Sequence, residues 1–132
     1  MLRNYCTGLQ HVGIPTCRFS ETLRFYQALG FARGFETILD RKKVCFLSLA
    51  GVTVEIYEQD QTAGHPGAID HIALQVSDIQ ACYAEAVASG CNILTEGVRF
   101  LPYFENGVHY FTIGGINGEQ IEFASPLPLN MA

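Results

Sequence analysis

Two histidines and two glutamates occupy corresponding places in a sequence that repeats itself, and their chemistry suits a divalent metal ion. His11 and His71 lie 60 residues apart, each in a segment of alternating polarity. Glu55 and Glu122 lie 67 residues apart, each in a later alternating segment. Imidazole and carboxylate together suit borderline ions such as Ni²⁺, Co²⁺, Zn²⁺ or Mn²⁺. We therefore predict one such ion per site, with octahedral positions left open for water or a chelating substrate.

The alternation of polarity predicts which way these four side chains face. Successive side chains of a strand point to opposite faces, so Glu55 faces away from Val54 and Ile56, and His11 faces away from Val12. The second half follows the same rule for His71 and Glu122. Any one of these residues alone would pass as an ordinary strand residue. Their symmetric placement within a repeat is what favours a metal site.

The repeat extends beyond these residues and predicts the order of the elements. At an offset of 60, residues 10–14 fall on 70–74 and residues 29–30 fall on 89–90. The later drift to 67 fits a longer loop in the second half, around 97–107. Each half reads as strand, helix and three strands, which is a βαβββ unit.

The expected elements can be given by their bounds. In the first half we expect a strand at 7–16 and then a helix that starts at an N-cap Ser20 and stops at Gly30. Three strands follow, at 33–39, 43–50 and 52–59. In the second half we expect a strand at 69–77 and then a helix that starts at Ser77 or Asp78 and ends at Gly90. Three strands follow, at 92–98, 107–114 and 119–125.

These elements predict an α+β fold in which two βαβββ modules form curved mixed sheets with helices on the convex face. We expect a single domain over 1–132, made of repeats 5–59 and 68–125 joined by a linker at 60–67. The linker is rich in Gly, Pro and polar residues, as a connection between two units would be.

Composition excludes several classes of function. The 132 residues are 48% hydrophobic and 16% charged, which is globular, and 13 acidic against 8 basic residues give a net charge of −5. With no basic cluster, nucleic acid and anionic membranes are excluded as partners. We expect no membrane span and no secretory signal. Five cysteines without a Cys-x-x-Cys pair predict reduced thiols in a cytoplasmic protein, with Cys45, Cys82 and Cys91 as small buried hydrophobes.

Five short segments carry a family resemblance: LQHVGI at 9–14, FYQALGF at 25–31, VEIY at 54–57, DHIAL at 70–74 and NGEQIEF at 117–123. Through them, residues 8–125 resemble the vicinal oxygen chelate superfamily, the glyoxalase and bleomycin-resistance group. The four-ligand set is similar to that of bacterial glyoxalase I, or lactoylglutathione lyase.

The resemblance implies a metal-dependent lyase or isomerase that acts on a small oxygen-chelating substrate through an enediolate-like intermediate. It assigns the proton-transferring base to Glu122, with Glu55 acting from the opposite side. It also implies a homodimer, in which each chain commonly supplies two ligands. The candidates for substrate contact are Tyr57 and Gln75, which share the ligand face by parity, and Arg99.

The glutathione determinants of glyoxalase I are not matched, and other functions stay open. Glyoxalase I enzymes tend to place Arg four residues after the first ligand, where this chain has Pro15. We therefore predict a substrate that does not contain glutathione. The alternatives are a non-catalytic drug- or metabolite-binding protein of the bleomycin-resistance type and a methylmalonyl-CoA-epimerase-like enzyme, although that epimerase usually has Gln where Glu55 stands. A dimerisation domain with a vestigial site is a third.

Overall fold

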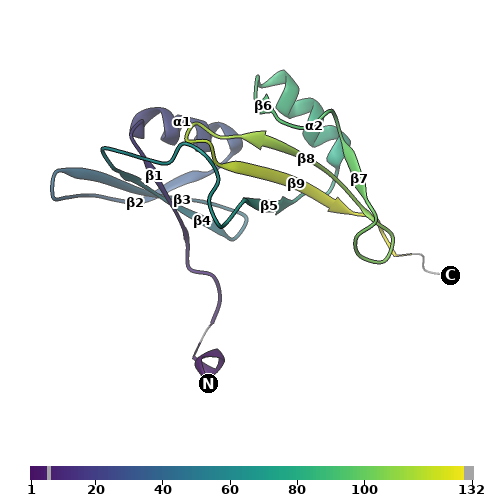
Figure 1. Ribbon diagram of the computed structural model, residues 1–132, viewed down its shortest axis with the longest axis horizontal. Coiled ribbons are helices and arrows are strands. Elements are labelled where there is room, and N and C mark those ends of the chain that lie inside the picture. Colours follow the sequence, from purple (N-terminus) through teal and green to yellow (C-terminus); the bar gives the residue numbers. More distant parts are fainter. Residues whose placement is uncertain (6, 130–132) are drawn as a thin grey trace. The chain divides into compact units, whose positions relative to one another are not determined.

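The chain forms two compact units, Met1–Thr62 and Ala63–Ala132, of which the computed structural model describes residues 1–5 and 7–129 (Figure 1). The boundary between the units falls inside segment 60–67. Each unit is a mixed sheet with one helix along one of its faces.

The first unit follows the predicted order after a short 3₁₀ turn at Leu2–Asn4. Its sheet has the strand order β1-β4-β3-β2, with β1 parallel to β4 and the other neighbours antiparallel. Its elements are β1 (Val12–Thr16), α1 (Phe19–Leu29), β2 (Ala32–Leu39), β3 (Lys42–Leu49) and β4 (Val52–Glu58).

The second unit repeats this plan. Its sheet has the order β5-β9-β8-β6, with β7 also paired to β8, and β5 runs parallel to β9. Its elements are β5 (His71–Gln75), α2 (Ile79–Ala88), β6 (Asn92–Ile93), β7 (Arg99–Leu101), β8 (Val108–Gly114) and β9 (Gln120–Pro126). The predicted α+β class with two mixed sheets is confirmed.

One predicted strand is wrong in detail, because the segment 92–98 is not continuous. The chain pairs with β8 through only two residues of β6, leaves the sheet, and returns as β7. Gly97 has a φ of +66°, a left-handed conformation that a strand does not contain and that glycine adopts at little cost.

Alternating burial builds each core on the helix side of its sheet. In the first unit Cys45, Leu47, Val54 and Ile56 are fully buried on the side of α1, whose Leu23 and Tyr26 are also buried. In the second, the buried side chains on the side of α2 include Phe111, Ile113 and Ile121, together with Ile79 and Ala86 of the helix. Tyr83 meets the Phe111 ring edge-on at 5.3 Å. Each large apolar side chain buried in this way stabilises the fold by about 1.5–3 kcal/mol.

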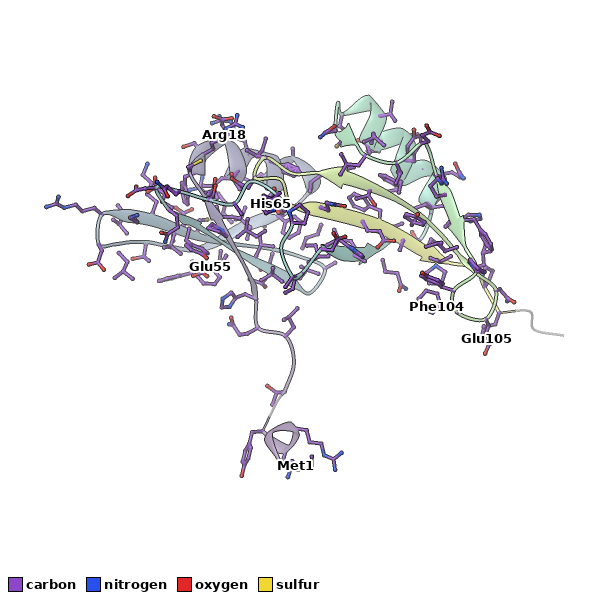
Figure 2. The ribbon with its side chains drawn as sticks, viewed as in Figure 1. Met1, Arg18, Glu55, His65, Phe104 and Glu105 are labelled. Atoms are coloured by element: carbon purple, nitrogen blue, oxygen red, sulfur yellow. The ribbon has the colours of Figure 1, made fainter. Side chains whose placement is uncertain are left out.

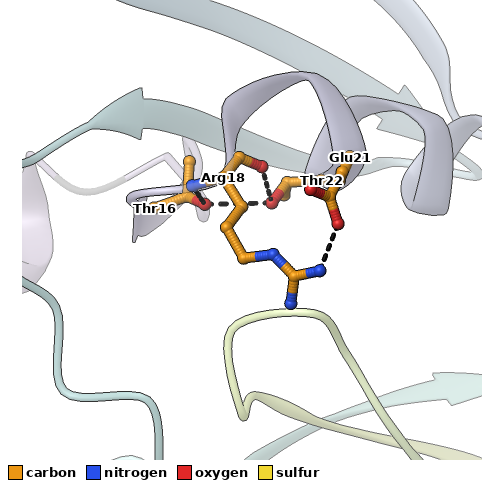
Figure 3. Close-up of polar contacts among 4 residues, drawn as sticks. All are labelled: Thr16, Arg18, Glu21 and Thr22. Carbon is orange, nitrogen blue, oxygen red and sulfur yellow. Dashed lines mark hydrogen bonds and ion pairs between the residues drawn. The ribbon is translucent and has the colours of Figure 1, made fainter.

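Helix α1 begins two residues earlier than an N-cap at Ser20 requires, so that prediction is wrong. Its N-cap is Arg18, which makes no side-chain cap bond; instead its backbone N–H donates to the Thr16 hydroxyl (2.8 Å). The hydroxyls of Thr16 and Thr22 lie 3.0 Å apart, and that of Thr22 donates to the Arg18 carbonyl (Figure 3). A threonine from the preceding strand therefore fixes the residue at the helix start, although it accepts from the N-cap N–H and not from the first-turn N–H groups that a serine cap would bind. Gly30 ends the helix as predicted, with a φ of +111°.

This hydroxyl cluster gives a stability prediction. Thr16→Val keeps the shape of a fully buried side chain but leaves the Arg18 N–H without its hydroxyl acceptor, so unfolding should become easier by about 1–3 kcal/mol. Urea unfolding of the two proteins measures the difference. The matched control is Thr53→Val, which breaks an exposed bond to Ser48 and should change stability by less than about 0.5 kcal/mol. Equal effects of the two changes would contradict the cap assignment.

The cysteines of the described residues are free thiols. Cys45 is buried, Cys82 and Cys91 are partly buried, and Cys17 is exposed. Burial raises the pKa of the Cys45, Cys82 and Cys91 thiols, which makes them weak nucleophiles at neutral pH. Among the helices that the structure describes, no segment has the length and apolar character needed to cross a bilayer.

Candidate metal centre

The first predicted pair, His11 and Glu55, comes together at the start of β1. The parallel pairing of β1 with β4 sets Gly13 opposite Glu55, two residues beyond His11. His11 Nε2 lies 3.5 Å from Glu55 Oε1. On the other side of the ring, His11 Nδ1 donates to the side-chain carbonyl of Gln10, the residue just before it. The imidazole is thus held by its neighbour and presents Nε2 to the carboxylate.

The second pair, His71 and Glu122, repeats this arrangement. The parallel pairing of β5 with β9 sets Ala73 opposite Glu122, again two residues beyond the histidine. His71 Nε2 lies 3.0 Å from Glu122 Oε2, and His71 Nδ1 lies 2.9 Å from Asp70 Oδ2. Each unit therefore builds its own His–Glu pair with the same ring nitrogen facing the carboxylate.

Both pairs lie on the sheet face opposite the helix, which we call the pair face. Val54 and Ile56 are fully buried on the helix face, while Glu55 leaves the sheet on the side away from α1 (Figure 2). The Glu55 side chain is 27% exposed and that of Glu122 is 17% exposed. The two carboxylates are thus partly shielded from water yet reachable.

Each unit offers one pair of side chains whose donor atoms suit a divalent ion. Within either unit, the described residues bring no three metal-ligating side chains together, so each unit offers two. An imidazole whose Nδ1 is hydrogen-bonded is the usual form of a metal-binding histidine, because the second bond fixes the ring and leaves Nε2 for the ion. Gln10 and Asp70 supply that second bond, and sequence reasoning missed them, although each directly precedes a predicted ligand.

The predicted substrate residues lie on the pair faces. A methyl group placed on Gly13 would lie 3.5 Å from both the Glu55 carboxylate and the Tyr57 ring, so these two side chains are neighbours. In the second sheet, Gln75 and Arg99 stand in one row across four strands, joined through Ala124 and Tyr110. That row crosses β9 at Ala124, two residues beyond Glu122 and therefore on the same face.

Two aromatic residues next to the first pair were not predicted. Phe46 is paired in register with Glu55, and its ring meets the His11 ring edge-on at 5.4 Å. Phe35 lies beside it, with ring centroids 6.2 Å apart. The alternation of Phe46 with the buried Cys45 and Leu47 was a usable signal for its face.

The remaining histidines, both in the second unit, do not join the His71–Glu122 pair among the described residues. His65 is exposed, and its Nδ1 lies 2.8 Å from the Pro66 carbonyl oxygen. His109, expected at the surface, is half-buried because its ring packs against that of Phe100 at 5.6 Å.

Comparison with known sequences settles the family. The sequence model of the Glyoxalase/Bleomycin resistance protein/Dioxygenase superfamily matches residues 8–101. The chain belongs to this superfamily. An uncharacterized protein of Bacillus subtilis, YwbC, is 28% identical over an alignment of 124 residues that covers 87% of this chain and 94% of that protein.

Solved structures show the same fold at low sequence identity. A glyoxalase family protein from Enterococcus faecalis superposes with a TM-score of 0.75 at 23% identity, covering 91% of this chain and 98% of its own. The fosfomycin resistance protein FosX from Listeria monocytogenes, solved with Mn(II) and sulfate, superposes with a TM-score of 0.71 at 16% identity, covering 92% of this chain and 94% of its own.

Proposed function

We propose that this superfamily member is a metal-dependent lyase or isomerase of the glyoxalase I type, with His11, Glu55, His71 and Glu122 as ligands of one divalent ion. The observation that carries the proposal is the duplicated pair, built twice at matching positions with Nε2 facing the carboxylate at 3.5 and 3.0 Å. That FosX of the same superfamily was solved with Mn(II) supports an ion of the Ni, Co, Zn or Mn kind.

The proposal requires the two pairs to share one ion. Since each unit offers two donors among its described residues, four ligands come either from one chain or from two chains of a homodimer. A homodimer is our proposal for the assembly, because β1, β2 and β5 are sheet edges with backbone groups available for pairing. Sedimentation of a metal-loaded monomer would show instead that one chain suffices.

The chemistry that these residues perform is a proton transfer between neighbouring carbons. A bound ion supplies Lewis acidity toward the substrate's oxygen pair, which acidifies the adjacent C–H bond. Glu122 takes that proton and returns it to the neighbouring carbon, so no atom is gained or lost. Glu55 acts from the opposite side, and Gln10 and Asp70 hold the two imidazoles in place.

A metal analysis followed by an exchange screen tests this function. The purified protein should contain a divalent ion. In ²H₂O it should catalyse deuterium incorporation into one class among α-hydroxyketones, hemithioacetals and acyl-CoA thioesters. Activity should disappear with chelator and return with metal. A fully metal-loaded protein that exchanges none of these substrates would favour the non-catalytic binding protein, and a protein that takes up no metal would contradict the proposal.

The hydrogen bond from His71 to Asp70 gives a prediction of its own. Asp70→Ala removes the partner of His71 Nδ1 and should weaken metal binding about tenfold. This is the low end of the range for loss of such a hydrogen-bond partner, because Asp70 is exposed. Competition with a fluorescent chelator measures the change. The control Asp60→Ala removes the same charge from an exposed residue that pairs with Lys42, at 3.5 Å, and should leave the affinity unchanged. An equal loss in both variants would make the effect one of net charge.

A further inference from the structure

Three aromatic residues, Phe35, Phe46 and Tyr57, lie on the pair face of the first unit, and we call them the aromatic wall. Phe46 stands directly opposite Glu55 in the sheet and touches the His11 ring edge-on at 5.4 Å. Tyr57 lies beside the Glu55 carboxylate over Gly13. Phe35 extends the wall outward from Phe46. All three are on the pair face, away from the core.

A β-bulge is what brings Phe35 to this face. The register of β2 against β3 shifts between Arg33 and Glu36, so Gly34 and Phe35 together stand opposite the single residue Phe46. Without the extra residue, strict alternation would turn Phe35 to the helix face. Bulges re-aim side chains in this way and are over-represented next to active sites. The bulge leaves Phe35 66% exposed in the described structure, where its ring contributes little to folding.

The repeat shows that the fold does not need a ring at position 46. The residue paired with Glu122 in the second sheet is Thr112, where the first sheet has Phe46 beside Glu55. The two His–Glu pairs are alike, while the residues next to them differ. An aromatic ring at position 46 is therefore not required to hold a carboxylate in place, and a contact with a bound molecule explains it better.

We propose that the aromatic wall is a subsite for a flat apolar group, of the size of a phenyl ring, carried by the substrate next to its chelating oxygens. This inference rests on the proposed function and extends it by naming the substrate class. Rings stack or meet edge-to-face at 4.5–7 Å, and each such contact adds about 0.5–1.5 kcal/mol beyond area burial, which is roughly a twofold to tenfold gain in affinity. The wall lies close enough to His11 for one small molecule to contact both.

Two bidentate oxygen chelators that differ only in this group provide the test: benzohydroxamate and acetohydroxamate. Their dissociation constants are measured by calorimetry with the Mn²⁺-loaded protein, and their ratio cancels most of the strength of the shared chelating group. We expect benzohydroxamate to bind about tenfold more tightly. Phe35→Ala should lower this preference about threefold, and Phe46→Leu, which keeps an apolar side chain, should lower it by at least as much.

The matched control is Ile38→Ala. Ile38 is on the same strand and equally exposed, at 67%, but is paired with Lys43 on the helix face. This change should leave the preference intact. Equal binding of the two hydroxamates would overturn the aromatic subsite while leaving the metal proposal standing. If neither hydroxamate binds, or if both bind without metal, the aromatic subsite and the metal site are both overturned. A Phe35→Ala protein that loses self-association with an unchanged preference would show that the wall packs on a second copy instead, which also overturns the subsite.

Discussion

Replacing Glu122 with Gln should leave the metal bound and lower turnover by roughly 10²–10⁴-fold. Gln keeps the shape of the side chain and one coordinating oxygen but has no basicity, and general-base catalysis contributes a factor of this size. The carboxylate lies 3.0 Å from His71 Nε2 and its side chain is only 17% exposed, so bulk water has little access to replace it as base. Metal content and turnover are measured on the same preparation, with the substrate found by the exchange screen.

Two further variants separate the role of base from that of ligand. His11→Ala removes a nitrogen donor and should lose metal and activity together. Glu55→Gln, the same chemical change in the other unit, should reduce turnover less than Glu122→Gln. If Glu122→Gln retains most of its activity, the base is another residue, and Glu55 is the next candidate.

The hemithioacetal of glutathione and methylglyoxal should be a poor substrate, by one to two decades in kcat/KM relative to an enzyme with an arginine at position 15. Pro15 has no side-chain donor, and the loss of one charged hydrogen bond costs about 1.5–3 kcal/mol. The structure pairs Pro15 with Tyr57, so this position is on the pair face of the edge strand β1.

This position allows the prediction to be tested in both directions. Pro15→Arg should raise kcat/KM for the hemithioacetal about tenfold, because an edge strand accepts the change and the new side chain starts from the pair face. The steady-state assay compares the two proteins. Wild-type efficiency near the diffusional ceiling of ~10⁸ M⁻¹s⁻¹ would contradict our account of the substrate.

The sequence predicted the faces of the strands because burial enforces them. Val54 and Ile56 are fully buried, which forces Glu55 to the other face, and a slip of one residue would have exposed the core. Because the second half repeats the first, the same reasoning applies to His71 and Glu122 in the second sheet. Where one face of a sheet is packed by a helix, alternation alone therefore places the polar residues of the other face.

The features that were missed depend on local departures from alternation. Phe35 reaches the pair face only through the bulge, for which Gly34 inside the strand was a signal. The helix start was misplaced because its hydrogen-bond acceptor, Thr16, comes from the preceding strand and not from the residue next to the helix. The break between β6 and β7 contains a left-handed glycine, Gly97, whose conformation no periodicity reveals.

Metal stoichiometry in single-ligand variants tests the central claim, that the two His–Glu pairs serve one ion, most directly. Elemental analysis of the wild-type protein should give one divalent ion per chain, whether the four ligands come from one chain or from two. His11→Ala and His71→Ala, one in each unit, should each remove nearly all of that metal, because either change breaks the same site. Two ions per chain in the wild type, or a loss of only half the metal in each variant, would contradict a shared site and show two independent ones.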